Sequence, residues 1–305
     1  MHSFKGKTAV LTGAGSGFGL ECARIGASQG MNLVLLDVQA DALAAAQAEL
    51  TPVVANHGAQ ILSRVMDVSN EAAMTQMAAD VHAQFGAPHF VFNNAGVGAG
   101  GLLWENTTAD WQWVLGVNLW GVVHGVRLFT PMMLEAARRD PSYQGHIVNT
   151  ASMAGLLTAP NMGIYNVSKH AVVALTETLY QDLRLVTDQI SASVLCPYFV
   201  PTGISQSHRN RPDALSAAKP TASQLIGQAM SDKAVSSGKV SAAQVAQKVF
   251  DAVRDDQFYI YSHPQALATV EARFKALVAG EQPPDPFELR PQVGEQLRAA
   301  LRDGV

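Results

Sequence analysis

A glycine-rich turn, TGAGSGFG at residues 12–19, separates an apolar run at 8–12 from an amphipathic segment that extends to about residue 30. Gly13, Gly17 and Gly19 permit a tight turn and a close approach of a ligand to the backbone. The helix that follows would present its first N–H groups to a phosphate. The order strand, glycine turn, helix predicts the start of a dinucleotide-binding fold, and an ordinary glycine-rich turn is the simpler alternative.

Short apolar runs alternate with longer amphipathic segments along the rest of the chain. This alternation predicts an α/β fold with one Rossmann-type, doubly wound parallel sheet flanked by helices. The expected strands are at 8–12, 32–37, 61–67, 90–94, 146–152, 192–197 and 258–262.

Two regions depart from the alternation. The stretch 201–224 is polar and rich in proline, which indicates a loop or lid with short helices, and we place the lid at about 199–240. We assign 1–262 to an NAD-binding and catalytic domain and 263–305 to a C-terminal helix and tail extension. From about residue 280 the tail reads as an extended arm ending in a short helix, which either clasps a neighbouring subunit or frays.

Composition excludes several classes of partner. Charged residues make up 15% of the 305 residues, the net charge is −4 and no long basic run occurs, so neither nucleic acid nor an anionic membrane surface is an expected partner. The short basic clusters, Arg138-Arg139 and Arg209/Arg211, read as solvated loops. The two cysteines, Cys22 and Cys196, read as buried apolar residues without a disulfide framework. No signal peptide or membrane-spanning run is recognisable, which predicts a cytoplasmic protein.

Asp37 ends the second expected strand, 18 residues after Gly19. A carboxylate at this place can accept hydrogen bonds from the adenosine ribose hydroxyls, which favours NAD over NADP. Its alternative role is that of a turn-forming aspartate. Together with the glycine turn, it makes nucleotide binding the stronger interpretation.

The stretch YNVSK places Tyr165 and Lys169 four residues apart, on one face of a helix. Five segments in this order resemble the short-chain dehydrogenase/reductase family of the compact, non-extended type, over residues 5 to about 262. Their counterparts here are TGxxxGxG at 12–19, NNAG at 93–96, Asn118 in GVNLWG, Ser152 and YxxxK at 165–169.

The resemblance implies a catalytic set of Asn118, Ser152, Tyr165 and Lys169. Tyr165 would act as general base in alcohol oxidation and general acid in ketone reduction. A lysine ammonium beside a tyrosine favours the phenolate, whose ordinary pKa near 10 is too high for a base at neutral pH. Ser152 would hydrogen-bond the substrate oxygen, and Asn118 would hold a water that carries the proton towards solvent. Taken singly, Ser152 and Asn118 could equally be structural residues.

The resemblance also implies a set of NAD contacts around the sheet. Asp67 and Val68 would lie beside the adenine, and Thr202 would face the carboxamide. The full set comprises Gly13, Ser16, Gly17, Phe18, Gly19, Asp37, Asp67, Val68, Asn94, Ala95, Gly96, Tyr165, Lys169, Pro197, Val200 and Thr202.

The chain departs from the family pattern at two places. Tyr198 follows Pro197 where the family usually has glycine, which makes the path towards Val200 and Thr202 less certain. An additional stretch at 135–145 is expected at the sheet edge away from the catalytic ends.

The candidate substrate wall is apolar and carries no obvious cation to bind a carboxylate, which favours a neutral secondary alcohol or ketone with hydrophobic or aryl bulk. Ser152, Met153, Tyr165 and Phe199 are the expected substrate contacts. Leu156, Leu157, Met162 and Trp104 are the further candidates, and core packing is the alternative for several of these side chains.

Three other classes of function are alternatives to a dehydrogenase. Ser16 and Ser152 both lack the G-x-S-x-G context of a serine hydrolase, and nine dispersed histidines form no zinc motif, so no metal is expected. A non-catalytic NAD-binding, redox-sensing protein on the same fold stays open. The family resemblance implies a homotetramer or homodimer, and the segment 172–183 has apolar residues on more than one face, as a helix between sheet and partner would.

Overall fold

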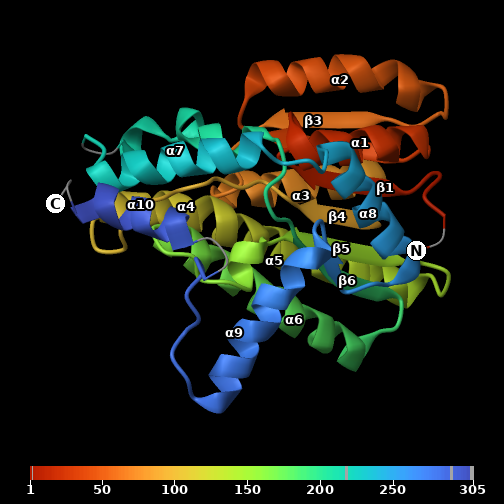
Figure 1. Cartoon of the computed structure of the whole chain (residues 1–305). Helices are drawn as coiled ribbons and strands as arrows, with labels where there is room; N and C mark the ends of the chain where they lie inside the picture. The colour runs from red at the N-terminus through yellow and green to blue at the C-terminus, as the bar shows by residue number, and fades with distance from the viewer. Residues whose placement is uncertain (2, 217–218, 289–290, 303–305) are drawn as a thin grey trace.

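The computed structural model describes residues 1, 3–216, 219–288 and 291–302. Within them the chain forms a seven-stranded sheet in the order β3-β2-β1-β4-β5-β6-β7, with every neighbouring pair parallel (Figure 1). The predicted α/β fold and its strands are confirmed. The strands are β1 (Thr8–Thr12), β2 (Asn32–Asp37), β3 (Ile61–Val65), β4 (Phe90–Asn93), β5 (Gly145–Thr150), β6 (Ile190–Cys196) and β7 (Tyr259–Tyr261).

The strand order reverses at β1, which pairs with β2 on one side and β4 on the other. In an open parallel sheet the crevice at such a switch point lies beyond the carboxyl ends of the strands and is the usual ligand site. The additional stretch at 135–145 spans the end of α5 and the start of β5, at the amino end of that strand. It is therefore on the side opposite the crevice, as expected.

Helices cover both faces of the sheet. Four of them begin with a side-chain cap: capping boxes begin α4, α7 and α8, and the Asn70 side chain accepts the Ala73 N–H at the start of α3. The described helices are α1 (Gly17–Ser28), α2 (Ala40–Ala55), α3 (Glu71–Phe85), α4 (Thr108–Leu115), α5 (Gly121–Arg139), α6 (Gly163–Val186), α7 (Ala222–Ser236), α8 (Ala242–Asp255), α9 (Leu267–Ala279) and α10 (Pro291–Arg302).

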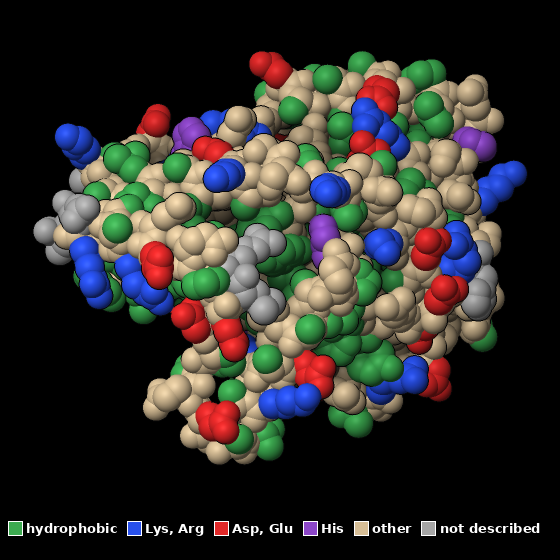
Figure 2. All heavy atoms as spheres, in the orientation of Figure 1, with side chains coloured by type: hydrophobic (Ala, Val, Ile, Leu, Met, Phe, Trp, Pro, Cys, Tyr) green, Lys and Arg blue, Asp and Glu red, His purple; other side chains and the backbone are tan. Residues whose placement is uncertain are grey.

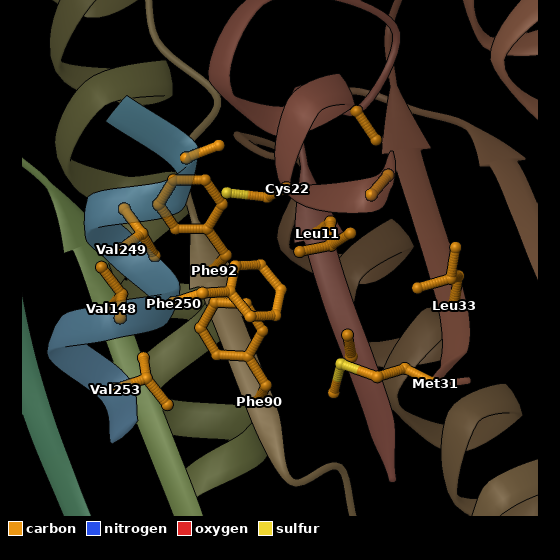
Figure 3. Close-up of a cluster of buried hydrophobic side chains, with 14 of the residues drawn as sticks. Leu11, Cys22, Met31, Leu33, Phe90, Phe92, Val148, Val249, Phe250 and Val253 are labelled. Carbon is orange, nitrogen blue, oxygen red and sulfur yellow. The ribbon is translucent and has the colours of Figure 1, made fainter. Parts of the chain in front are cut away.

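Each face of the sheet has its own apolar core. On one face, residues of α1, α2 and α8 pack on the strands, and Figure 3 shows Cys22 and Phe250 among the side chains over β1 and β4. On the other face, α3, α5 and α6 supply residues such as Met77, Phe129 and Leu183. Cys22 and Cys196 are both free and buried, which confirms their interpretation as core residues.

The lid and the tail lie outside this layered core. The lid carries two 3-10 helices, Gly203–Asn210 and Asp213–Leu215, followed by α7, which is longer than the short helices expected there. The tail runs from α9 to α10, and α10 packs on α7 (Figure 1). Residues 217–218 of the predicted lid and 289–290 and 303–305 of the predicted tail lie outside the described residues.

Among the described helices, none combines the length and the apolar character that crossing a membrane would require.

Candidate active site

Residues far apart in the sequence meet at the carboxyl ends of the strands. The glycine turn follows β1, Asp37 ends β2, the segment Asn94–Gly96 follows β4, and Ser152 follows β5. Parallel strands present all these ends at one edge of the sheet. The sheet therefore gathers the residues that the sequence motifs identified.

The glycine turn can exist only with glycine at several positions. Gly13 and Gly17 have φ of 67° and 55°, in the left-handed region that favours glycine. A β-carbon on Gly19 would lie 2.0 Å from the carbonyl oxygen of Gly13. The turn thus brings bare backbone to the N-terminus of α1, which fits a phosphate group.

Asp37 organises this turn. Its carboxylate is buried, with 7% exposure, and accepts hydrogen bonds from the Gly15 N–H at 2.8 Å and the Gln39 N–H at 2.9 Å. Each carboxylate oxygen then keeps a lone pair for a further donor. The residue therefore shapes the turn and keeps acceptor capacity, and its contact with the ribose stays a prediction.

Asp67 and Val68, the two residues predicted to lie beside the adenine, contact neighbouring parts of the chain. Asp67 accepts the Ser69 N–H at 2.8 Å, which closes the turn after β3. Val68 is 6% exposed, and its Cγ2 lies 2.6 Å from where a β-carbon on Gly121 would stand. Both residues lie next to β2 at the carboxyl edge of the sheet, on the side of Asp37.

Thr12 joins the glycine turn to the segment after β4. Its hydroxyl oxygen accepts the N–H groups of Asn94 at 2.8 Å and Ala95 at 2.9 Å, while the Asn94 side-chain amide donates to the Thr12 carbonyl at 3.0 Å. Sequence reasoning did not assign Thr12 a role, although it is the first residue of the TGxxxGxG motif. A hydroxyl at the end of a strand that precedes a functional turn is the signal that could have identified it.

Asn118 lies in a π-helical turn, Gly116–Trp120, between α4 and α5. Its amide oxygen accepts the Val97 N–H at 2.8 Å, and its nitrogen donates to the Val97 carbonyl at 3.0 Å and to the Ser168 hydroxyl at 3.1 Å. These contacts fasten the segment after β4 to α6, which carries Tyr165. The side chain is therefore engaged with protein groups, and its expected role of holding a water stays a prediction.

Ser152, Tyr165 and Lys169 form one cluster. Ser152 is the N-terminal cap of a 3-10 turn, Met153–Gly155, and its hydroxyl accepts the Ala154 N–H at 3.1 Å and donates to the Pro197 carbonyl at 3.3 Å. The phenol of Tyr165 is a neighbour of the Ser152 side chain. Lys169 is 3% exposed, and its ammonium lies 5.7 Å from the centre of the Tyr165 ring.

Burial shifts the pKa of both titratable side chains in this cluster. Burial raises the pKa of Tyr165, and the neighbouring Ser152 side chain offsets only part of this effect. Burial also lowers the pKa of Lys169 to about 8, partly offset by Cys196. Burial therefore opposes the predicted depression of the tyrosine pKa, and the effect of the neighbouring ammonium on that pKa stays a prediction.

Lys169 is positioned by the strand beside it. Its ammonium donates to the Thr150 carbonyl at 2.9 Å and lies 3.6 Å from where a β-carbon on Gly96 would stand. The Thr150 hydroxyl in turn donates to the Asn94 side-chain oxygen at 3.2 Å. One chain of contacts therefore links the lysine to the same segment that Thr12 and Asn118 hold.

Tyr198 occupies the family's glycine position without backbone strain. The described non-glycine residues with positive φ are Asn161 and Asp256, so Tyr198 does not need the conformation that glycine would supply. Its N–H donates to the Ser262 hydroxyl at 2.9 Å, and its ring packs on Phe199 and on His263. Beyond this bend, Val200 is buried and Thr202 reaches the glycine turn, 3.5 Å from where a β-carbon on Gly17 would stand.

The predicted substrate wall is partly core. Met153 and Leu156 are 1% and 7% exposed and pack in an apolar cluster with Val270 of α9. Trp104 is 80% exposed, and its place in the wall stays a prediction. Phe199 is half-buried and follows the Tyr198 bend. In the view of Figure 2, hydrophobic side chains lie near the centre of the molecule, between α7 and α9, and charged side chains surround them.

The structure corrects the prediction for Arg211, which is not a solvated loop residue. Its guanidinium pairs with Asp110 at 2.5 Å, donates to the Leu215 carbonyl at 2.6 Å and stacks on Trp113, 5.3 Å from the ring centre. Burial alone would raise the pKa of Asp110, but hydrogen bonds from Thr107 and Arg211 lower it. The arginine fastens the lid to α4.

The segment 172–183, in α6, was expected to pack on the sheet and on a partner subunit, and the structure shows the packing on the sheet. Val172, Leu179 and Leu183 of α6 are buried towards the sheet. On the outer side, Leu175 and Thr178 line a surface hollow together with α5. A second subunit at this hollow stays a prediction.

Within the described ranges, His, Cys, Asp and Glu side chains form no group of three or more that could hold a metal ion.

Comparisons with known proteins agree with this fold. The short chain dehydrogenase family model matches residues 7–213. A CLA biosynthesis dehydrogenase/reductase of Lactiplantibacillus plantarum is 32% identical over 287 residues, covering 93% of this chain and 97% of that protein. A C alpha-dehydrogenase of Sphingobium is 31% identical over 310 residues, covering 99% and 96%. A crystal structure of a short chain dehydrogenase/reductase from Burkholderia phymatum in complex with NAD is 51% identical, with a TM-score of 0.89, and covers 94% of this chain and 99% of that one.

Proposed function

The chain belongs to the short-chain dehydrogenase/reductase family, and from this premise we propose that it is an NAD-dependent enzyme that interconverts a neutral, hydrophobic or aryl secondary alcohol and its ketone. The observation that carries the proposal is the cluster of Ser152, Tyr165 and buried Lys169 at the edge of the sheet where the glycine turn and Asp37 also lie. A protein that only sensed NAD would have no need of a proton-transfer group there.

Each residue of the cluster has a chemical role. NAD, when bound, supplies the acceptor for the hydride that leaves the alcohol carbon. Tyr165 takes the hydroxyl proton during oxidation and returns it during reduction. Ser152 donates a hydrogen bond to the substrate oxygen and stabilises the charge that develops on it. The Lys169 ammonium favours the phenolate over the neutral phenol, against the effect of burial.

The preference for a neutral substrate is supported by the cations around the site. Arg211 is paired with Asp110, and Arg273 of α9 donates to the Leu156 carbonyl at 3.2 Å. Both guanidinium groups therefore already have protein partners. The relative named C alpha-dehydrogenase, which this chain matches over nearly its whole length, is consistent with an alcohol substrate.

A panel of secondary alcohols and ketones, followed by NADH absorbance, tests the activity. Tyr165→Phe should lower kcat about 10²–10⁴-fold and leave the Kd for NAD nearly unchanged, because the hydroxyl acts on the proton during the chemical step. Tyr180→Phe, a variant of a second tyrosine on α6, is the matched control and should keep its activity. Full turnover by Tyr165→Phe would remove the proposed base, and no turnover with any compound would favour the sensor.

A further inference from the structure

The first part of the lid, the 3-10 helix Gly203–Asn210, is fixed close to the glycine turn. Thr202, at its start, lies against Gly17. Within it, Ser207 is 3% exposed and its hydroxyl accepts the Gly98 N–H at 3.0 Å. The segment is thus held at both sides of the expected cofactor crevice, between β1 and β4.

Arg209 extends from this segment to the residue that follows the Asp37 turn. Its guanidinium donates to the carbonyls of Gly203 at 3.1 Å and Gln206 at 2.7 Å, and to the side-chain oxygen of Gln39 at 3.4 Å. Gln39 is itself tied to Asp37 through its N–H. The guanidinium therefore bridges the lid and the side of the crevice expected to hold the adenosine ribose.

The arrangement leaves part of the guanidinium available. The Nη2 atom lies 2.8 Å from where a β-carbon on Gly203 would stand, so any larger residue at 203 would displace it. Among the described residues this nitrogen has no hydrogen-bond partner, whereas Nε and Nη1 hold the group in place. An arginine fixed by two of its nitrogens and open at the third is preorganised for an anion.

The glycine turn, residues 12–19, contains no cation of its own. The first turn of α1 offers N–H groups to a phosphate, but the residue just before it, Ser16, is neutral. Asp37, which contacts the glycine turn, adds a negative charge. Arg24, also on α1, is occupied by Glu21 and Glu49. A dinucleotide brings a diphosphate with two further negative charges to this place.

We propose that Arg209 is a cofactor-binding residue, which binds the diphosphate of the dinucleotide from the adenosine side. The inference rests on the proposed NAD site and adds a residue that no sequence motif marks. Gln39 acts as a positioning residue, because its side chain orients the guanidinium.

Equilibrium binding of cofactor fragments tests this without any turnover. Adenosine, ADP, ADP-ribose and 2′,5′-ADP are titrated by calorimetry against the parent protein, Arg209→Met and Arg209→Lys. Arg138→Met is the matched control, because it removes one exposed arginine at the end of α5, away from the crevice.

Arg209→Met should weaken ADP and ADP-ribose about tenfold and leave adenosine unchanged, since only the phosphates contact the guanidinium. Arg209→Lys should be intermediate, because it keeps the charge and loses the planar fork. Arg138→Met should bind every fragment as the parent protein does. Raising the salt concentration should weaken ADP-ribose more in the parent than in Arg209→Met.

Four outcomes would overturn the inference. Unchanged affinity for ADP and ADP-ribose in Arg209→Met would show that the arginine serves only the lid. An equal loss for adenosine would show general loosening of the site, and a loss confined to 2′,5′-ADP would assign the arginine to a 2′-phosphate. If the parent protein itself failed to bind ADP-ribose, the proposed NAD site would be overturned and the role of Arg209 with it, whereas a loss seen only in Arg209→Met leaves that site standing.

Discussion

At the scale of single residues, the site depends on side chains that serve the fold and the chemistry together. Asp37 holds the glycine turn through two backbone N–H groups and still has lone pairs to offer a ligand. Lys169 lies buried on the Thr150 carbonyl and beside the tyrosine ring. Replacing either residue therefore changes structure and activity at once, and the experiments have to separate the two.

Asp37 should make the enzyme prefer NAD over NADP. NADP would bring a 2′-phosphate close to the carboxylate, and two unit charges about 4 Å apart repel by roughly 4 kcal/mol at an effective dielectric near 20. Solvent screening reduces this to about 2–3 kcal/mol, or on the order of a hundredfold in kcat/KM. The measurement is kcat/KM for both cofactors with one shared alcohol.

The double variant Asp37→Ser, Val38→Arg should narrow or reverse that preference, through lost repulsion and a new phosphate contact. Because Asp37 also holds Gly15, a loss of thermal stability should accompany the change. Val38→Arg alone keeps the turn intact and serves as the control. Equal kcat/KM values for NAD and NADP in the parent protein would contradict the assignment of Asp37 to the ribose.

The buried Lys169 should make stability depend on pH in a defined window. Burial lowers its pKa from 10.5 to about 8, so the folded protein holds this proton less tightly than the unfolded chain does. The folded state is therefore disfavoured by the full amount below pH 8, and it gains stability as the pH rises from about 8 towards 10.5.

Lys169→Met removes the titrating group, so the stability of the variant no longer gains from this pH rise. The difference in Tm, variant minus parent, should therefore fall between pH 8 and pH 10. Lys5→Met, at an exposed lysine, should show no such trend. The same Lys169→Met variant should also shift the pH–rate profile for alcohol oxidation to higher pH, because the tyrosine loses its neighbouring cation. If the Tm profiles of parent and variant ran parallel and the pH–rate curve did not move, the pKa of Lys169 would not be lowered by burial and the residue would have no part in the mechanism.

At the scale of elements, the lid is attached by polar contacts to several parts of the chain. Arg211 joins it to Asp110 of α4, and the Ser223 hydroxyl of α7 accepts the Leu102 N–H at 2.9 Å. The Asn161 side chain, just before α6, donates to the Ser223 carbonyl at 3.0 Å. These contacts connect the lid to the helix that carries Tyr165.

Arg211→Met should loosen the lid and raise KM for the alcohol, with a smaller effect on kcat. Removing one partner of a half-buried ion pair leaves Asp110 buried without its cation, at a cost of about 2–3 kcal/mol. Hydrogen exchange of the 203–210 amides should accelerate accordingly. In contrast, Lys275→Met at the exposed pair with Glu271 should change stability by no more than about 0.5 kcal/mol. Unaltered exchange in Arg211→Met would show that the pair does not secure the lid.

At the scale of the whole molecule, the C-terminal extension contacts both the Ser152 turn and the lid. α9 contacts the turn through Arg273 on the Leu156 carbonyl and Val270 in the cluster with Met153. The tail then returns to the lid, where α10 packs on α7 and Leu297 is 6% exposed (Figure 1). The extension therefore links the turn that carries Ser152 to the lid.

Two truncations separate these contacts. Ending the chain after Gly280 removes α10 and should raise KM for the alcohol while the Tm stays within a few degrees, because the sheet core is untouched. Ending it after Ala266 also removes α9 and exposes apolar residues beneath Ser152, so Tm should fall further and kcat should drop. Calorimetry and steady-state kinetics on both chains measure this, and equal effects would show that α9 does not support the serine turn.

The sequence by itself determined the sheet and its chemical residues. Strand positions follow from short apolar runs, and the glycine turn, Asp37 and the Tyr165–Lys169 pair are recognisable because their spacing is local. The parallel order then places these residues at one edge, since the carboxyl ends of parallel strands coincide. For this part of the protein, local pattern and topology suffice.

Only the tertiary structure decided how the lid and the extension meet this core. Arg209 lies 170 residues from Gln39, Arg211 lies 101 from Asp110, and Arg273 lies 117 from Leu156. No periodicity relates such positions, because each contact depends on how irregular segments fold back over a finished sheet. The pKa shifts of Tyr165 and Lys169 were decided in the same way, since burial is set by all the elements that surround a side chain and not by its neighbours in the sequence.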